Sequence, residues 1–386
     1  MIAGATFSST TIFLAMAVQN PLNIQELLDL CIDFVSESRP SLLSCSLVAR
    51  AWVNTAQSHL FHNPLYVPPD SSQIQDVDAM ALRLLEALQS FHHLIRHVHA
   101  LDFIQVRPDS TVEKICGLGF THLEKLTIEV DHRIEYWQSE AFVRVLALPT
   151  LRFLAIHSTV RVPSSCDTLF RRLSPSIQHL RLACPRWDLR EMQPAGDAAA
   201  APNRLTSLTL DAGPAQCLLP GVMRPLDISN LLALSVWRAD KISWNTIPHR
   251  TMQSLRILNL RLSIFDEDGV DLSIFPNLAV LRVDRAYTLS ALCHTVTTLC
   301  SPRVIIITAS CLNFEHDECD VLDGILGSFD SSPLPVVEFE LVRRGDEGQI
   351  EWGSRFPILA SQNRLRVVCR TWEMAEQWWE QTIDAL

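Results

Sequence analysis

The chain has 386 residues, of which 48% are hydrophobic, and its formal net charge at pH 7 is −11. This length fits two or three average domains or one long solenoid, and the hydrophobic content is enough for a large buried core. The acidic charge argues against a nucleic-acid partner, because phosphate binding requires a basic surface, and also against binding to an acidic membrane surface.

The cysteines indicate a reducing compartment. There are eleven, scattered without a CxxC pair, and no Asn begins an N-x-Ser/Thr glycosylation sequence. Secreted proteins of this size usually carry paired cysteines in disulfides. We therefore expect the protein in the cytoplasm, the nucleus or both.

The first 19 residues are expected to form a loose tail. The apolar run 11–18 is too short to span a bilayer. It ends in small residues, as a signal peptide does, but the first 38 residues contain no Lys or Arg and so lack the positive start of such a peptide. A signal peptide remains the alternative.

The segment that follows predicts an amphipathic helix. Ile24, Leu27, Leu28 and Cys31 are spaced i, i+3, i+4, i+7, and Ile32 continues the same face. The segment 36–41, SESRPS, ends the helix at its proline.

A second apolar segment, LLSCSLVARAW (42–52), predicts another helix, and VNTAQSHLF (53–61) predicts a third, closed by Pro64. The second segment is apolar on more than one side, so we expect it to bury two faces. Three short helices form only a marginal core, so part of this apolar area is expected to be covered by a partner.

Residues 20–66 resemble an F-box of the kind found in large fungal families. The resemblance rests on three pieces: I-x-x-L-L-x-x-x-I-D-F from Ile24, then LLSCSLVARAW, then HLF at 59–61. Where such boxes usually open with Leu-Pro, this chain has Leu22-Asn23. The resemblance implies binding to a Skp-type adaptor, which would connect the protein to a cullin-RING (SCF-type) ubiquitin ligase.

The residues that the resemblance assigns to adaptor binding are all apolar: Leu22, Ile24, Leu27, Leu28, Ile32, Leu43, Leu47, Val48 and Trp52. Packing within the head is the alternative role, and it is as plausible for Leu28, Ile32 and Leu47, since one stripe of each helix must face inward. Trp52 is favoured as an interface residue, because Trp is enriched at binding hot spots.

Residues 67–94 are expected to be a helical linker, with a helix over 76–91, and a repeat fills residues 95–386. The motif L-x-x-L-x-L recurs with conservative exchanges at intervals of 23 to 32 residues. Its copies begin at Val98, Leu123, Leu151, Ile177, Leu205, Leu231, Leu255, Leu278, Val304, Val336 and Leu365.

This period is typical of leucine-rich repeats. Alternating leucines predict a strand with one buried face, and segments such as 139–148 between the copies predict helices. Such units bury a core only when stacked. The chain therefore resembles an irregular leucine-rich-repeat solenoid of the α/β class, with parallel strands on the concave face, helices on the convex face, and no asparagine at the usual position after the strand.

Two further segments belong to this solenoid. Residues 193–202, QPAGDAAAAP, are expected to form a loop between units. The last repeat is followed by TWEMAEQWWEQTIDAL, in which Trp372, Ala375, Trp378 and Trp379 have helical spacing. We expect this segment to be a terminal capping helix.

The residues between the leucines of each strand should face the concave side, where solenoids usually bind partners. The predicted target-binding patch there consists of Arg181, Trp237, Arg261 and Arg282. Arg and Trp are common at interfaces, although solvated arginines are the alternative.

No sequence motif indicates an enzyme. The chain has no P-loop, dinucleotide fingerprint, nucleophile elbow or HExxH motif. The histidines of HHLIRHVH (92–99) and the ligand types of CLNFEHDEC (311–319) lack the further ligands of a metal site. We expect no catalytic residues, no metal and no cofactor.

The sequence thus favours a non-enzymatic ligase adaptor that binds an unidentified target protein. The near absence of lysine, with 29 of 32 basic residues being arginine, would give such an adaptor few sites for its own ubiquitination, although codon bias is the favoured explanation. The alternatives are an interaction scaffold without ligase contact and, less favoured, an enzyme on an α/β fold.

Overall fold

The structure of the protein is a computed structural model. The structure describes residues 25–36, 38–65, 77–103, 110–130, 139–158, 172–183, 203–211, 226–237, 244, 247–262, 269–284, 289–308, 316–329, 333–342, 352–370 and 378–383. The chain divides into two compact units, Met1–His62 and Asn63–Leu386, which we call the head unit and the sheet unit. The expected tail (1–19) and loop (193–202) lie outside the described residues.

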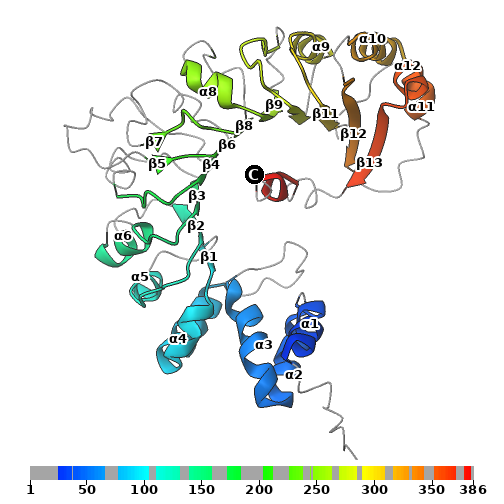
Figure 1. The fold of residues 1–386 in the computed structure, drawn as a ribbon. Helices are drawn as coiled ribbons and strands as arrows, with labels where there is room; N and C mark the ends of the chain where they lie inside the picture. Colours follow the sequence, from blue (N-terminus) through cyan, green and yellow to red (C-terminus); the bar gives the residue numbers. More distant parts are fainter. Residues whose placement is uncertain are drawn as a thin grey trace, which may run out of the picture. The chain divides into compact units, whose positions relative to one another are not determined.

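The head unit contains three helices, α1 (Gln25–Phe34), α2 (Arg39–Val48) and α3 (Arg50–His62) (Figure 1). Pro40 lies in the first turn of α2, with Ser38 at the N-cap position, so this proline begins a helix as well as preventing the previous one from continuing. Proline is tolerated there because the first helical N–H groups have no partner within the helix.

LLSCSLVARAW is divided between two helices, which corrects the prediction of a single helix. Ala49 has an extended conformation (φ −155°, ψ 153°) and separates α2 from α3. The break lets both helices contribute to one core, in which Leu42 of α2 packs with Ile32 of α1 and with Ala56 and Leu60 of α3. No proline or glycine marks this break in the sequence, because tertiary packing determines it.

The sheet unit begins with α4 (Val77–Ser90) and the 3₁₀ helix η2 (His92–His97), and then contains a parallel sheet that has eleven strands in the described part of the chain. The strands lie in chain order: β1 (Ala100–Phe103), β2 (Lys125–Val130), β3 (Phe153–Ser158), β4 (His179–Ala183), β6 (Ser207–Asp211), β8 (Ala233–Trp237), β9 (Ile257–Arg261), β10 (Val280–Asp284), β11 (Val304–Thr308), β12 (Val336–Val342) and β13 (Leu365–Arg370). Each copy of the repeated motif coincides with one strand, and the predicted α/β class is confirmed.

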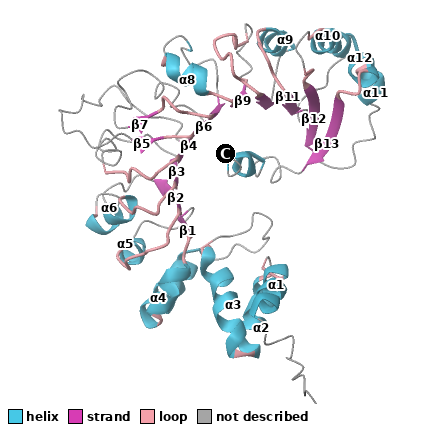
Figure 2. Ribbon diagram, in the orientation of Figure 1, coloured by secondary structure: helices cyan, strands magenta, loops and turns pink. Residues whose placement is uncertain are grey.

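Helices and turns connect the strands, as parallel pairing requires. Figure 2 shows that the helices lie on the outer side of the curved sheet. They are α5 (Ser110–Cys116), α6 (Glu140–Leu146), α8 (His249–Ser254), α9 (Leu289–Thr297), α10 (His316–Gly327), α11 (Trp352–Arg355) and α12 (Pro357–Ser361). A separate two-stranded sheet pairs β5 (Asn203–Arg204) with β7 (Leu226–Asp227).

The core of the sheet unit lies between the sheet and these helices. In β6, Leu208 and Leu210 are at most 1% exposed, and the corresponding residues of neighbouring strands are buried in the same way. Alternation along a strand sends these leucines to one face and the intervening residues to the other.

Hydroxyl groups bridge successive repeats just before the strands begin. Thr150 Oγ1 donates to the Leu123 carbonyl at 2.8 Å, and Ser254 Oγ donates to the Leu231 carbonyl at 2.9 Å. Each donor directly precedes one motif, and each acceptor is the first residue of the preceding motif. These bonds satisfy buried carbonyl groups that neither strand nor helix uses.

The C-terminal segment differs from the predicted terminal cap. Residues 378–383, which we call the C-terminal helix, pack on the inner face of the sheet near its middle (Figure 1). Trp379 and Ile383 are buried against Ala233 of β8 and Ile257 of β9. Residues 378–383 are helical as predicted, whereas Trp372 and Ala375 lie outside the described residues. The buried side chains of Trp379 and Ile383 cover the concave face and not the end of the sheet beyond β13.

Candidate functional site

The head unit has a small core and an apolar exterior. The core contains Ile32, Leu42, Ala56 and Leu60, which are all at most 7% exposed. Leu28 is also buried. The assignment of Leu28 and Ile32 to adaptor binding is therefore corrected: both side chains pack inside the head and leave no surface for a partner.

Trp52 lies in the first turn of α3 and is half-buried. Its side chain packs against the core cluster, as do Val35, Cys45 and Phe61. This position makes Trp52 chiefly a structural residue of the head and weakens its assignment as an interface residue.

The remaining described residues of the predicted adaptor-binding set are exposed. The exposed fractions are 43% for Leu27, 51% for Leu43, 86% for Leu47 and 65% for Val48. Leu22 and Ile24 lie outside the described residues. An apolar side chain with this exposure gains only part of its possible burial energy from its own fold, so the exposed parts of these four residues are available to a partner.

The sequence analysis missed two residues of the same kind. Phe34 is 92% exposed and Leu30 is 64% exposed. Together with Leu27 they have the spacing i, i+3, i+7, which defines a second stripe on the side of α1 that faces away from the buried stripe. That spacing is the sequence pattern from which the exposed stripe could have been predicted. We call Leu27, Leu30, Phe34, Leu43, Leu47 and Val48 the head apolar surface.

Polar contacts fix α1 against α3 in the head. Asp29 Oδ1 accepts a hydrogen bond from Thr55 Oγ1 at 2.6 Å, and His59 Nε2 lies 2.7 Å from Asp33 Oδ1. The hydrogen bonds from Thr55 and Gln25 lower the pKa of Asp29. These contacts fix the rotation of α1 relative to α3 and therefore determine which side of α1 is buried.

The second candidate surface is the concave face of the sheet. Strand register aligns its residues in rows, as predicted, and one row runs through Thr127, Ala155, Arg181, Thr209, Ser235, Asn259 and Arg282. Most of this row is buried, with Ser235 at 2% and Arg282 at 4% exposed. The expectation of an open face is corrected, because the C-terminal helix and the neighbouring side chains cover it.

The four predicted patch residues fall into separate environments. Trp237 and Arg261 are register partners on β8 and β9, and the guanidinium of Arg261 lies 3.7 Å from the centre of the Trp237 ring. Arg282 forms a buried ion pair with Glu340, with 2.6 Å between Nη2 and Oε2. Arg181 lines a small cavity together with Trp379 and Glu380. The structure therefore does not unite the four as one exposed patch.

Burial and charge shift two titratable groups on this face. Burial, followed by the nearby charge of Arg181, lowers the pKa of His157 to about 4, so the ring is neutral at pH 7. Burial raises the pKa of Asp284, and the Glu340 carboxylate acts in the same direction, whereas Arg282 opposes both. The face therefore holds charges in a partly desolvated environment, where they act more strongly than in water.

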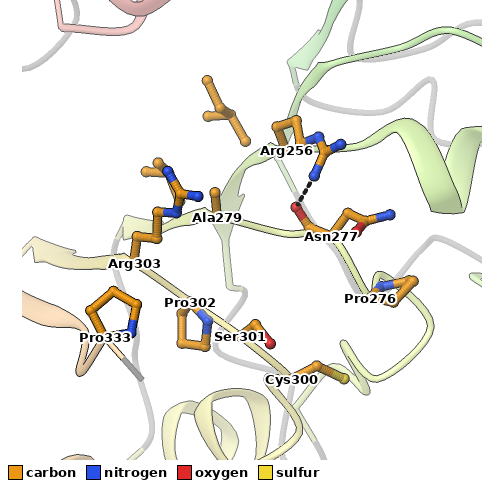
Figure 3. Close-up of a pocket in the computed structure, with 11 residues that line it drawn as sticks. Arg256, Pro276, Asn277, Ala279, Cys300, Ser301, Pro302, Arg303 and Pro333 are labelled. Atoms are coloured by element: carbon orange, nitrogen blue, oxygen red, sulfur yellow. Dashed lines mark hydrogen bonds between the residues drawn. The ribbon is translucent and has the colours of Figure 1, made fainter. Parts of the chain in front are cut away.

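A pocket of about 820 Å³ opens where β9, β10 and β11 begin. Figure 3 shows Arg256 and Arg303 on opposite sides of this pocket, with Ala279 between them. The Nη1 of Arg256 donates to the Asn277 carbonyl at 3.4 Å. Two arginines at one opening favour an anionic group.

The described residues contain no group of three or more His, Cys, Asp or Glu side chains that could hold a metal ion. Among the clustered histidines, His97 is buried and its Nε2 accepts a hydrogen bond from Arg96 Nε at 3.2 Å. Burial and the charge of Arg96 lower its pKa, so this histidine is a neutral structural residue. Cys311 lies outside the described part of the chain.

Comparison with known proteins finds neither a protein-family model nor a curated protein that matches this chain. Among the described residues, no helix is both long enough and apolar enough to cross a membrane.

Proposed function

We propose that the protein is a substrate-recognition adaptor of an SCF-type ubiquitin ligase. In this proposal the head unit is an F-box that binds a Skp-type adaptor, and the sheet unit is an irregular leucine-rich-repeat array that binds the target protein. The catalytic contribution is proximity, since the protein would hold a target lysine near the charged conjugating enzyme.

The head apolar surface is the observation that carries the proposal. Six large apolar side chains of α1 and α2 are between 43% and 92% exposed, although the same helices also supply a buried core. A contiguous exposed apolar area on a soluble domain marks an interaction site, and we infer that these six side chains form such an area. The surface lies on the segments whose sequence resembles an F-box.

The sheet unit supports the second half of the proposal. One parallel strand per motif, in chain order, is the arrangement that a leucine-rich-repeat array requires. The thiols of Cys116, Cys293 and Cys319 all have raised pKa values because of burial. Thiols that stay protonated are poor nucleophiles, which favours a binding function over thiol catalysis at these positions.

The proposal is tested by co-expression with a Skp-type adaptor and purification through a tag on the adaptor. The test variant is Leu47→Asp combined with Val48→Asp, because both side chains are exposed and their replacement leaves the head core intact. The matched control is Val321→Asp on α10, where an apolar side chain of the sheet unit is 54% exposed.

We expect the wild type and the control to co-purify with the Skp-type adaptor, and we expect the double variant not to co-purify with it. Retention of all three would show that the head apolar surface is not the binding surface. If the wild type itself does not co-purify, the ligase proposal is wrong, and the alternative of an interaction scaffold without ligase contact is favoured.

A further inference from the structure

The C-terminal helix makes specific contacts with the concave face. The indole Nε1 of Trp379 donates a hydrogen bond to Thr209 Oγ1 on β6 at 2.8 Å. Trp379 and Ile383 fill the surface formed by Ala233 and Ile257 on β8 and β9. A buried indole nearly always needs such an acceptor, so Thr209 defines the position of the ring.

Charged residues surround this contact. Glu380 Oε2 lies 3.2 Å from Lys125 Nζ on β2, and the Arg282 guanidinium on β10 lies 4.8 Å from the centre of the Trp378 ring. The helix of residues 378–383 therefore contacts strands from β2 to β10, because the curved sheet brings them around it (Figure 1). The ammonium group of Lys125 thus pairs with the Glu380 carboxylate, and the guanidinium of Arg282 contacts the Trp378 ring.

The surface beneath the C-terminal helix differs from the core of the sheet unit. The core face carries Leu, Ile, Val and Phe, whereas the covered row carries Thr209, Ser235, Asn259 and Arg282. Polar side chains are uncommon in permanent cores and are easily hydrated when uncovered. This face can therefore be covered by a bound segment or exposed to water without a large cost to the fold.

The C-terminal helix also leaves the polar groups of this face incompletely satisfied. Asn259 is 9% exposed, and its Nδ2 donates to Ser235 Oγ at 3.0 Å. The Oδ1 of Asn259 and the Oδ1 of Asp284 have no hydrogen-bond partner among the described residues. A buried acceptor without a donor costs free energy, so an occupant that supplies donors there would bind better than the C-terminal helix.

We propose that the concave face is a recognition site for a short helical segment with a tryptophan followed by an acidic residue, and that residues 378–383 occupy this site from within the chain. This inference rests on the proposed function and specifies the chemistry of the target. Thr209 accepts the indole N–H, Ala233 and Ile257 receive the apolar side chains, and Lys125 pairs with the carboxylate.

The neighbouring pocket extends the site. Ile257 lines that pocket and belongs to the same core cluster as Trp379 and Ile383, and Val280, which also lines the pocket, packs against this cluster, so the two surfaces adjoin. A target segment longer than the helix reaches Arg256 and Arg303, which favour further acidic residues. The site therefore selects an acidic amphipathic helix over a basic one.

The test uses a fluorescently labelled peptide of residues 371–386 and measures its binding by fluorescence polarisation. It is titrated with the full chain and with a chain that ends at Arg370. We expect the truncated chain to bind the peptide and the full chain to bind it at least tenfold more weakly. A tethered segment has an effective concentration on the order of 1 mM, which gives this factor when the peptide's Kd is below about 0.1 mM.

Specificity is tested with matched changes on both sides. Trp379→Ala in the peptide is expected to weaken binding to the truncated chain at least tenfold. Lys125→Glu in the truncated chain should reverse the preference between the wild-type peptide and a Glu380→Lys peptide. A truncated chain that is folded but does not bind the peptide, or a full chain that binds it equally well, overturns the inference.

A second variant covers failure of the truncated chain to fold. The full chain with Trp379→Ala and Ile383→Ala keeps every residue but loses the contacts, and it should fold and bind the peptide in trans. If neither chain folds, the C-terminal helix is a fixed part of the core and the inference is wrong. The peptide assay contains no Skp-type adaptor, so its result is independent of the co-purification test. If the chain binds the adaptor but not the peptide, only this inference is rejected. If it binds the peptide but not the adaptor, only the ligase proposal is rejected.

Discussion

The head unit exposes large apolar side chains, whereas the sheet unit buries polar and charged ones. In the head unit, Phe34 and Leu47 are 92% and 86% exposed. In the sheet unit, Ser235, Arg282 and Glu340 are at most 4% exposed, and Arg282 and Glu340 form a buried ion pair. The stability of a fold favours neither arrangement, since exposed apolar groups gain nothing and buried polar groups cost desolvation. Departures of this kind are expected where a surface serves binding.

The two proposed binding surfaces differ in whether they are covered. The apolar side chains of the head apolar surface are exposed. The concave face is covered by a segment of the same chain, which contacts Thr209 through Trp379 and Lys125 through Glu380. Under the two proposals, a partner would bind the head apolar surface directly, whereas a target would first have to displace the C-terminal helix from the concave face.

The largest effect is expected from breaking the buried ion pair. Glu340→Ala should lower the free energy of unfolding by about 3–5 kcal/mol, because it leaves Arg282 charged and buried without its carboxylate. Thr308 also loses its hydrogen bond to Glu340, which is 3.0 Å long. Urea unfolding of the variant and the wild type measures the change, and a loss below about 1 kcal/mol would contradict the buried pair.

A matched pair of leucine substitutions tests the contrast between core and surface directly. Leu258 on β9 is fully buried, and Leu258→Ala is expected to cost about 2–5 kcal/mol. Leu47→Ala should change the free energy of unfolding by less than about 0.5 kcal/mol, because its side chain is 86% exposed. Thermal unfolding of both variants checks this, and equal losses would mean that Leu47 is part of a core.

The next effect is a dependence on pH. The pKa of His157 is about 4 in the folded protein and ordinarily 6.5, so between these values the unfolded chain binds a proton that the folded chain does not. Stability therefore falls as the pH decreases through this window, by about 2 kcal/mol between pH 7.5 and pH 5 for this group. Urea unfolding of wild type and His157→Gln at both pH values should show a smaller decrease in the variant. An equal decrease in both would contradict the burial of His157 beside Arg181.

The smallest effect is expected from the hydroxyl groups between repeats. Ser254→Ala removes the hydrogen bond to the Leu231 carbonyl and should cost about 1 kcal/mol. Ser328→Ala is a control, because its exposed hydroxyl, directly after α10, donates to the Ile325 carbonyl three residues away and not to another repeat. Thermal unfolding should rank Ser254→Ala below the control, and the opposite order would contradict a role in connecting repeats.

The sequence was sufficient for the strands because their signal is local. Alternating apolar residues such as Leu208 and Leu210 define the strand and its buried face together, and the register follows from stacking like positions. The helix over 77–90 was predicted within one residue at each end for the same reason, since its spacing is regular.

The candidate sites were harder to predict from the sequence because they depend on contacts between segments that are far apart in the chain. Nothing near Trp379 indicates that its indole bonds Thr209, 170 residues away. Arg282 looks like a surface arginine in the sequence, and its partner Glu340 is 58 residues away. The break at Ala49 has no local signal either, so Trp52 was placed on the wrong helix. The spacing of the exposed stripe that ends at Phe34 is present in the sequence, but apolar residues on both sides of α1 do not reveal which side is buried.

The central claim is that the head apolar surface binds a Skp-type adaptor, and the most direct measurement is the Kd of the purified full chain for the purified adaptor by isothermal titration calorimetry. The account predicts measurable binding by the wild type and at least a 100-fold weaker Kd for Leu47→Asp with Val48→Asp, because each apolar side chain buried on binding contributes about 1.5–3 kcal/mol. A wild-type chain that shows no binding, or a double variant with an unchanged Kd, would contradict it.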